Sequence, residues 1–133
     1  MPRGQILVVD DEPSILSTLK KALSLEGYTV DVVGGVTLAA ERVAKKSYDV
    51  LLLDVSLPDG NGVELLERLR AGGVETPVIM MSGHATIDTA VRATRLGALD
   101  FLEKPVSTDR LLVVLDNTLR LMRAEEAALE LRA

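Results

Sequence analysis

LVVDDEP, residues 7–13, decides the fold: an apolar run passes directly into three consecutive carboxylates, Asp10, Asp11 and Glu12. Carboxylates repel one another, and placing several at the end of a buried strand costs free energy. An apolar run without alternation is typical of a strand that is covered on both faces, as in a parallel sheet. Ligands of such sheets bind at the carboxyl ends of the strands. The stretch therefore predicts a buried parallel strand that ends in a charged site.

Further apolar runs follow along the chain, and helical patterns separate them. Most runs are nearly continuous in Val, Ile or Leu, whereas the last, ALDFL, is mixed. With right-handed crossovers, this alternation of strand and helix gives a doubly wound α/β sandwich. Strands are expected at 6–9, 30–33, 50–53, 78–81 and 98–102. Helices are expected at 14–25, 36–44, 62–69, 86–96 and from 107 or 108 to the chain end, with Gly27 ending the first and Thr86 capping the fourth.

Composition limits the class of protein. The 133 residues suit one domain of ordinary size, and the absence of Cys excludes disulfides and thiolate metal sites. The net charge of −5 argues against nucleic-acid binding, because phosphate contacts need clustered Lys and Arg. No apolar run reaches the roughly 18 residues of a membrane span, and no signal-peptide pattern precedes Asp10. We expect a soluble cytoplasmic domain that contacts neither nucleic acid nor membrane.

The end of the chain differs in pattern from the rest. Residues at a 3,4 spacing predict a helix with a coiled-coil-like seam, which Glu126 interrupts. Up to residue 121, one amphipathic helix packed on the sheet is an equal alternative. A helix of about 25 residues would outrun a small sheet at 1.5 Å per residue. We therefore expect a domain at 1–121 and the start of a helical linker at 122–133. The predicted seam comprises Leu112, Leu115, Leu119, Met122, Glu126, Leu129 and Ala133.

Polar side chains follow most of the predicted strands. Asp10 and Asp11 follow the first strand, Asp54 the third, Ser82 the fourth and Lys104 the fifth. Parallel strands bring their carboxyl ends to one edge of a sheet, so we expect these side chains to lie together. Three carboxylates in one pocket need a cation, and their oxygens suit Mg²⁺. The acidic run is therefore interpreted as part of a magnesium site.

This set of residues suits phosphoryl chemistry. A carboxylate beside Mg²⁺ can attack phosphorus and form an acyl phosphate, whose oxygens need positive or donor partners such as Lys104 and the Ser82 hydroxyl. Each residue also has a simpler role, which is favoured when it is taken singly. Asp10 or Asp11 could cap a helix, Asp54 could start a turn, Ser82 could be an N-cap and Lys104 could be a solvated surface lysine. Their joint placement at the strand ends favours the site. The sequence leaves open whether the Lys104–Pro105 bond is cis.

Four motifs, VVDDEP, LLLDVSLPDGNG, MSGHAT and GALDFLEKP, occur in this order. Together they resemble the receiver domains of two-component response regulators over about residues 4–121. The resemblance implies a flavodoxin-like (βα)5 fold with sheet order 2-1-3-4-5 and an extended C-terminal helix. It implies that Asp54 accepts a phosphoryl group from the phosphohistidine of a sensor histidine kinase. It further implies that Asp11, Asp54 and the Ser56 carbonyl bind Mg²⁺ directly and that Asp10 binds it through water. In the same family pattern, Ser82 is the switch hydroxyl, Lys104 the invariant lysine and Phe101 the switch aromatic.

The stretch SGHATIDTAVRATRLGALDFLEKP, residues 82–105, is similar to receivers of sigma-54-dependent, nitrogen-regulation-class transcription activators. Those proteins place a helical linker, an AAA+ ATPase and a DNA-binding domain after the receiver. The resemblance implies that phosphorylation reshapes the surface of the fourth helix, fifth strand and fifth helix, a candidate homodimer interface. The alternative, that the apolar residues of 86–96 only face the core, stays open. Two departures matter: Leu99 stands where an aromatic is frequent, and Phe101 lacks a hydroxyl, so burial alone must drive its rotation.

Rival functions fit the residues less well. A Mg²⁺-dependent phosphatase with Asp54 as nucleophile is expected to carry a general-acid carboxylate about two residues later, where this chain has Ser56. A nucleotide-binding domain is expected to carry a GxxxxGK[ST] or GxGxxG loop, but carboxylates follow the first strand. His84 has no second His or Cys with which to build a transition-metal site, and we expect it at the pocket rim or exposed. We expect a phosphoacceptor signalling module rather than an enzyme.

Overall fold

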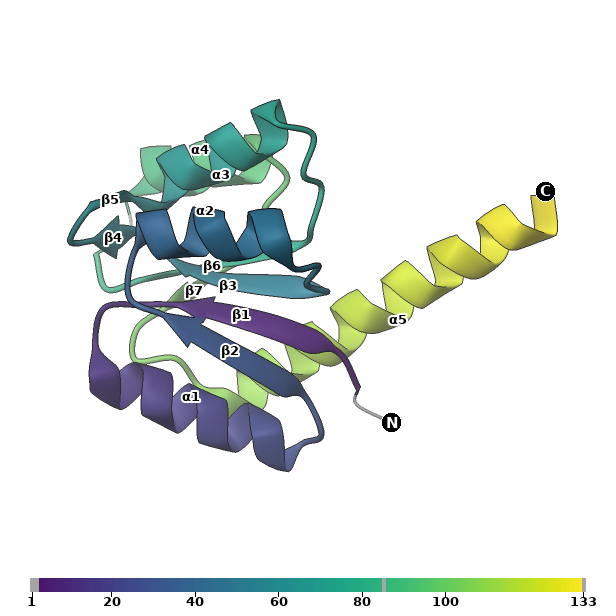
Figure 1. Cartoon of the computed structure of the whole chain (residues 1–133), viewed down its shortest axis with the longest axis horizontal. Coiled ribbons are helices and arrows are strands. Elements are labelled where there is room, and N and C mark those ends of the chain that lie inside the picture. Colours follow the sequence, from purple (N-terminus) through teal and green to yellow (C-terminus); the bar gives the residue numbers. More distant parts are fainter. Residues whose placement is uncertain (1–2, 85, 133) are drawn as a thin grey trace.

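The computed structural model describes residues 3–84 and 86–132 and contains a parallel sheet with helices on both faces (Figure 1). The sheet order is β2-β1-β3-β6-β7, and each neighbouring pair is parallel. The strands are β1 (Gln5–Val9), β2 (Thr29–Val33), β3 (Val50–Asp54), β6 (Val78–Ser82) and β7 (Asp100–Glu103). Because β4 and β5 belong to a separate two-stranded sheet, β6 and β7 are the fourth and fifth strands of the large sheet. The order is therefore the predicted 2-1-3-4-5, and the (βα)5 fold is confirmed.

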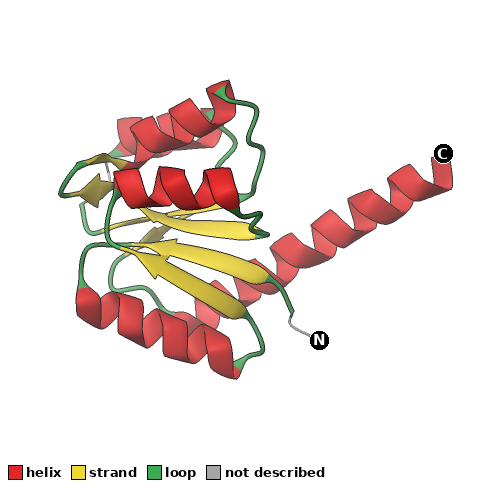
Figure 2. Cartoon of the chain, in the orientation of Figure 1, coloured by secondary structure: helices red, strands yellow, loops and turns green. Residues whose placement is uncertain are grey.

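The helices form the two outer layers, as Figure 2 shows by element type. Helices α1 and α5 cover one face of the sheet, and α2, α3 and α4 cover the other. Their bounds are α1 (Pro13–Leu25), α2 (Val36–Lys45), α3 (Gly62–Ala71), α4 (Ile87–Arg95) and α5 (Thr108–Arg132). Two signals in the sequence mark helix ends correctly. Gly27 follows α1 with a φ of 93°, and the Thr86 hydroxyl caps α4 by accepting a hydrogen bond from the Thr89 N–H.

The central strands are buried on both faces, which explains their continuous apolar runs. Leu7 and Val9 of β1 pack in the cluster under α2, α3 and α4, whereas Ile6 and Val8 pack in the cluster under α1 and α5. All residues of β3, including Asp54, are buried. Because both side-chain directions of these strands enter a core, no position is left for a polar residue until the strand ends. In these central strands, charge is therefore confined to the carboxyl ends.

The structure departs from the predicted elements around the loops. Ser56–Leu57 (β4) and Gly60–Asn61 (β5) form a small antiparallel hairpin, where the sequence predicts only a turn. Strand β7 begins at Asp100 rather than at residue 98, although the Leu99 N–H still donates to the Val78 carbonyl at 2.8 Å. Among the described residues, no helix is both long and apolar enough to cross a membrane.

Helix α5 has 25 residues and projects well beyond the sheet, as its predicted length requires (Figure 1). Leu115 and Leu119 of the predicted seam are buried against the sheet, but Leu129 is 65% exposed. Leu111, which the predicted seam leaves out, is fully buried. The near half of the seam is therefore used by the domain itself. Ala133, the last member of that seam, lies outside the described residues.

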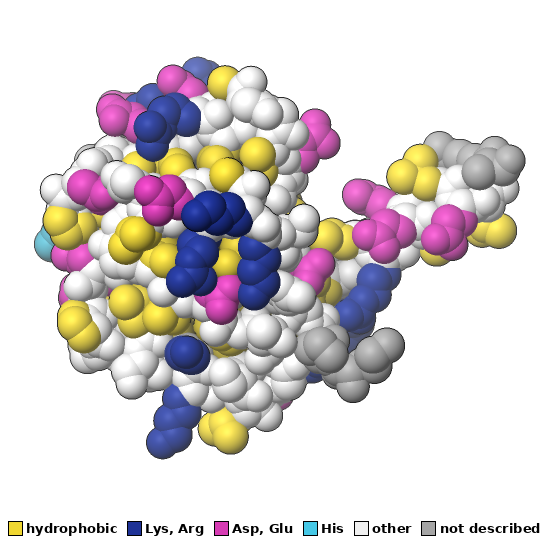
Figure 3. Space-filling model, viewed as in Figure 1, with side chains coloured by type: hydrophobic (Ala, Val, Ile, Leu, Met, Phe, Trp, Pro, Cys, Tyr) yellow, Lys and Arg dark blue, Asp and Glu magenta, His cyan; other side chains and the backbone are white. Residues whose placement is uncertain are grey.

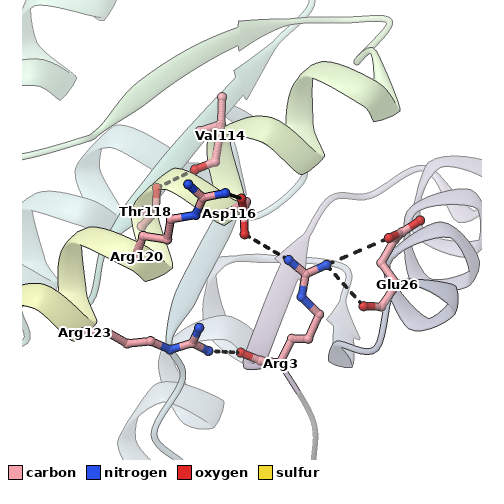
Figure 4. A network of polar contacts seen from close by, with 7 residues as sticks. All are labelled: Arg3, Glu26, Val114, Asp116, Thr118, Arg120 and Arg123. Carbon is pink, nitrogen blue, oxygen red and sulfur yellow. Dashed lines mark hydrogen bonds and ion pairs between the residues drawn. The ribbon is translucent and has the colours of Figure 1, made fainter.

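Arginines from both ends of the chain connect the N-terminal segment to the base of α5 (Figure 4). The Arg3 guanidinium lies 3.0 Å from Asp116 Oδ1 and 5.0 Å from the centroid of the Tyr28 ring. Arg123 donates to the Arg3 carbonyl at 3.0 Å, and Arg120 pairs with Asp116 at 2.6 Å. Each exposed ion pair contributes at most about 1 kcal/mol. Together they join the N-terminal segment to α5 near the place where this helix leaves the sheet.

Candidate phosphoryl-transfer site

The carboxyl edge of the sheet collects the polar residues that the sequence singles out. Asp10 directly follows β1, Asp54 and Ser82 end β3 and β6, and Lys104 directly follows β7. Asp10, Asp54 and Ser82 are buried, with exposed fractions of 0%, 4% and 4%. Asp11 lies beside them and is exposed. Parallel topology thus brings together side chains that are up to 94 positions apart in the sequence.

Three carboxylates of this edge form a group that could hold a metal ion. One oxygen each from Asp10, Asp11 and Asp54 lies within 4.8 Å of the others. Asp10 Oδ1 accepts a hydrogen bond from the Glu12 N–H at 2.9 Å, but the buried Asp10 Oδ2 has no hydrogen-bond partner among the described residues. Three carboxylates, one of which has an oxygen that accepts no hydrogen bond, suit a hard cation such as Mg²⁺. The Ser56 N–H donates to Asp54 Oδ1 at 3.3 Å, which places Ser56 next to this group.

Lys104 supplies positive charge to the same group. Its Nζ donates to Asp54 Oδ2 at 2.8 Å and lies 2.6 Å from Asp10 Oδ2. The contact with Asp10 is an ion pair, and this Asp10 oxygen accepts no hydrogen bond from the described residues. The Lys104 N–H also donates to the Ser82 carbonyl, and the Lys104–Pro105 bond is cis. Lys104 is therefore a structural part of the site.

Burial and charge both change proton affinities at the site. Burial raises the pKa of Asp54 above its ordinary value, the hydrogen bond from Lys104 opposes the rise, and the charge of Asp10 adds to it. Burial alone would lower the pKa of Lys104, but its contacts with Asp10 and Asp54 more than offset this effect and raise that pKa. Lys104 therefore keeps its proton. Burial makes the charged form of Asp54 less stable, and a bound cation would reduce this free-energy cost.

The simpler roles of these residues do not account for their positions. The N-cap of α1 is Glu12, which makes no side-chain cap, and α4 is capped by Thr86 rather than by Ser82. Among the described residues, the Ser82 Oγ accepts a hydrogen bond from the His84 N–H, at 3.1 Å, in the loop that follows β6. The Lys104 side chain is 14% exposed, which is unlike a solvated surface lysine. Asp10 and Asp54 each accept one hydrogen bond from a backbone N–H two residues later, on Oδ1. The Oδ2 atom of each carboxylate lies next to the Lys104 Nζ.

The remaining candidates lie outside this group. Phe101, on β7, is partly buried and packs against the cluster under α2, α3 and α4. His84 is exposed, one of the two placements expected for it. Leu99, at the position where an aromatic is frequent, is 54% exposed. None of these three residues belongs to the group of three carboxylates and lysine, and Leu99 lies at the other end of β7, where its N–H donates to the Val78 carbonyl at the start of β6.

Asp59 is a residue of the site loop that sequence reasoning missed. Its carboxylate accepts from the Val36 N–H at 2.8 Å and from the Thr37 N–H at 3.0 Å, so it caps α2 from a segment 22 or 23 positions away. The N-cap itself, Gly35, has no side chain, and a Cβ there would lie 2.6 Å from Asp59 Oδ1. The sequence contained one signal for such a cap: the helix start at 34–36, GGV, offers no side chain that could cap it, so the acceptor must come from elsewhere in the chain. The hairpin that follows Asp54 is thereby fixed to α2.

Replacing Asp59 by Ala is expected to lower the melting temperature at neutral pH, because two helix N–H groups lose their acceptor. The backbone N–H groups of Thr37 and Val36 lower the pKa of Asp59 below its ordinary value of 3.8. Its contribution to stability is therefore complete above that value and is lost as the pH falls through the lower folded-state pKa. The difference in melting temperature between parent and variant should shrink over that acid range. Glu41→Ala, an exposed carboxylate on the same helix, serves as control and should show neither effect; an equal loss in both variants would contradict the capping role.

Comparison with known proteins assigns the family. The response regulator receiver domain family matches residues 6–116. PilR of Pseudomonas aeruginosa is 37% identical over 134 aligned residues, which cover 99% of this chain and 30% of PilR. The crystal structure of NtrX from Brucella abortus in complex with ADP is 35% identical with a TM-score of 0.87, and the alignment covers all of this chain and 30% of NtrX. The solution structure of the beryllofluoride-activated NtrC4 receiver domain dimer is 38% identical with a TM-score of 0.82, covering 87% of this chain and 96% of that one.

These likenesses agree with the motifs in the sequence and with the sheet order. The chain spans about 30% of the length of PilR and of NtrX, so it corresponds to one part of such proteins. The resemblance to receivers of nitrogen-regulation-class activators is confirmed by these relatives. The chain belongs to the response regulator receiver domain family.

Proposed function

We propose that this receiver accepts a phosphoryl group on Asp54 from the phosphohistidine of a sensor histidine kinase. The observation that carries the proposal is the Lys104 Nζ between Asp10 Oδ2 and Asp54 Oδ2, at 2.6 and 2.8 Å, beside a third carboxylate. An Asp54 oxygen attacks phosphorus, the P–N bond to the kinase histidine breaks, and the imidazole leaves with its electron pair. The product is an aspartyl phosphate whose charge is carried by phosphoryl oxygens.

The residues around Asp54 have distinct tasks in this step. Lys104 can exchange its contact with the Asp54 carboxylate for one with a phosphoryl oxygen. The ammonium then stabilises the negative charge of the phosphoryl group that is being transferred. The Ser82 hydroxyl and backbone N–H groups near it are candidate donors to another oxygen. Asp11, Asp54 and the Ser56 carbonyl would hold Mg²⁺ directly, and Asp10 would hold it through water. When bound, Mg²⁺ supplies positive charge that lowers repulsion between the carboxylates and the incoming phosphoryl group.

The proposed output is a change of surface. Ser82 moves toward the phosphoryl group, Phe101 turns into the space that Ser82 leaves, and the face formed by α4, β7 and α5 changes shape. That face already exposes apolar side chains: Ile87 is 83% exposed, Val91 42% and Leu99 54%. The alternative that α4 serves only the core is weakened by these values. We propose this face as a homodimer interface, which the receiver dimer of NtrC4 supports by likeness.

The whole protein is proposed to be a sigma-54-dependent transcription activator that works in the cytoplasm. Residues 1–121 are then the receiver, and 122–133 begin a helical linker to an AAA+ ATPase and a DNA-binding domain. The similarity of this chain to PilR and to NtrX supports that arrangement. Within it, the receiver contacts its kinase and its own copy rather than DNA.

Acetyl phosphate separates this role from that of a phosphatase. Incubated with Mg²⁺ and acetyl phosphate, the chain should gain the mass of one phosphoryl group, and Asp54→Asn should gain none. Asp59→Asn, which alters a carboxylate of the same loop but not of the site, should keep the gain. Intact-mass spectrometry and release of inorganic phosphate measure the two outcomes. Steady turnover of a phosphate ester without accumulation of the labelled chain would favour the Mg²⁺-dependent aspartate-nucleophile phosphatase instead.

A further inference from the structure

The hairpin of β4 and β5, which follows Asp54, is too short to be stable alone. Its strands have two residues each, with Ser56 opposite Asn61. An isolated two-stranded hairpin is marginally stable at best in water, even when its strands are longer than these. Contacts with the rest of the chain must therefore hold this hairpin in place.

The N-termini of two helices provide such contacts. At the end of the hairpin, the Asn61 side chain caps α3, the next helix in the chain, by accepting from the Val63 N–H at 2.7 Å. At the turn of the hairpin, the Asp59 carboxylate caps α2 by accepting from two N–H groups that lie 22 and 23 positions away. Asn61 thus joins neighbours in the sequence, whereas Asp59 ties the hairpin to a distant segment.

The turn of the hairpin lies against the first turn of α2 (Figure 1). A Cβ on Gly60 would lie 3.3 Å from Val36 Cγ2, and a Cβ on Gly35 would lie 2.6 Å from Asp59 Oδ1. Acidic side chains are at the surface in this part of the molecule (Figure 3), and Asp59 is exposed. The N–H groups of Thr37 and Val36 lower its pKa, so the cap is charged at neutral pH. The hairpin and α2 are therefore joined by close packing and by a charged cap.

Ser56 is the residue of this hairpin that adjoins the carboxylates of the site. Its N–H donates to Asp54 Oδ1 at 3.3 Å, and in the proposed function its carbonyl binds Mg²⁺ directly. A backbone carbonyl moves only with its chain segment, so its place depends on the pairing with Asn61 and on the contacts that hold the turn. The cap on α2 and the proposed ion thus share one small hairpin.

We propose that Asp59 is a positioning residue for Mg²⁺: by capping α2 it fixes the hairpin and keeps the Ser56 carbonyl where the ion can bind it. Asp59 lies outside the group of three carboxylates that could hold the ion and acts through the backbone. Groups that orient metal ligands change the affinity for the metal without being ligands themselves. The proposal rests on the proposed function, because it takes the Mg²⁺ site from there.

The coupling between the cap and the ion must be reciprocal, because the two free energies are linked. If the cap favours the hairpin geometry that binds Mg²⁺, bound Mg²⁺ favours the cap by the same factor. The N–H groups of Val36 and Thr37 should therefore exchange with solvent more slowly when Mg²⁺ is present. A cap that serves only the stability of α2 would leave these exchange rates unchanged.

Calorimetric titration with Mg²⁺ measures the effect of the cap on affinity. Asp59→Ala should bind Mg²⁺ about fivefold more weakly, which corresponds to the loss of a typical helix cap that is transmitted in full. Asp59→Asn removes the same charge but keeps an acceptor oxygen, so its loss should be clearly smaller. Ala40→Gly, in the middle of α2, lowers the stability of that helix by another route and should bind Mg²⁺ as the parent does.

Amide exchange of the parent chain with and without Mg²⁺, followed by NMR, gives the second readout. Slower exchange at Val36 and Thr37 with Mg²⁺, together with the weaker binding by Asp59→Ala, would support the positioning role. Equal affinity of Asp59→Ala and the parent would overturn it, and so would an equal loss in Asp59→Asn or in Ala40→Gly. Uptake of Mg²⁺ by the parent and its labelling by acetyl phosphate test the proposed function separately, so a parent that passes both while Asp59→Ala matches it refutes the positioning role alone.

Discussion

Lys104→Met is expected to lower the free energy of unfolding of the metal-free chain by about 3 kcal/mol. The variant leaves the buried Asp10 and Asp54 facing each other without the ammonium that lies 2.6 and 2.8 Å from them. Removing one partner of a buried ionic group leaves uncompensated charge, which costs more than the intact group contributes. Mg²⁺ should then stabilise the variant more than it stabilises the parent, because the ion supplies the missing positive charge.

The same variant should be phosphorylated by acetyl phosphate about a hundredfold more slowly, because one donor to the transferring group is lost. Denaturant unfolding with EDTA and with Mg²⁺, and labelling rates from intact mass, measure the two effects. Lys20→Met, an exposed lysine on α1, is the matched control and should leave both quantities unchanged. A Lys104→Met variant as stable as the parent in EDTA, and labelled at the parent rate, would show that this amine has no part in the site.

Gly62→Ala is expected to destabilise the fold by more than about 3 kcal/mol and to disturb Asp54. A Cβ at this position would clash with the Asp54 carbonyl oxygen and would lie 3.2 Å from Leu53 Cγ. The obstacle is backbone, and Gly62 is held there because its N–H donates to the Val55 carbonyl at 2.7 Å. The start of α3 and the end of β3 must therefore move apart.

Gly34→Ala gives the matched comparison for this prediction. Nothing lies within 4 Å of the position of its Cβ, so the same chemical change should have little effect on stability. Thermal unfolding by circular dichroism, with acetyl phosphate labelling of whatever folds, measures both variants. Close agreement between the two melting temperatures would mean that the close approach of Gly62 to β3 does not constrain the site.

The strands and the charged edge could be predicted from sequence for a physical reason. Strands covered on both faces must be apolar throughout, so polar residues are displaced to their ends, as at Asp10 and Asp54. Parallel topology then makes neighbours of residues from distant segments, including Lys104. The pattern of the chain therefore contains both the order of elements and the composition of the candidate site.

Other features could not be predicted because their causes are not periodic. The strands β4 and β5 have two residues each, too few for an alternation to be visible. The cap on α2 by Asp59 joins segments that become neighbours only after folding. Helix α5 is apolar on more than one side, and only its position against the sheet shows that Leu111 is buried while Leu121 is not. Sequence indicates such a helix but does not say which side remains open.

Calorimetric titration with Mg²⁺ tests the central claim most directly, namely that carboxylates from two distant segments share one divalent ion beside an amine. The parent chain should bind one ion, and Asp11→Asn should bind it at least about tenfold more weakly because a charged ligand is lost. Glu12→Gln, which changes the neighbouring carboxylate outside the group of three, should bind as the parent does. No uptake of Mg²⁺ by the parent, or equal affinity in the Asp11→Asn variant, would contradict the account.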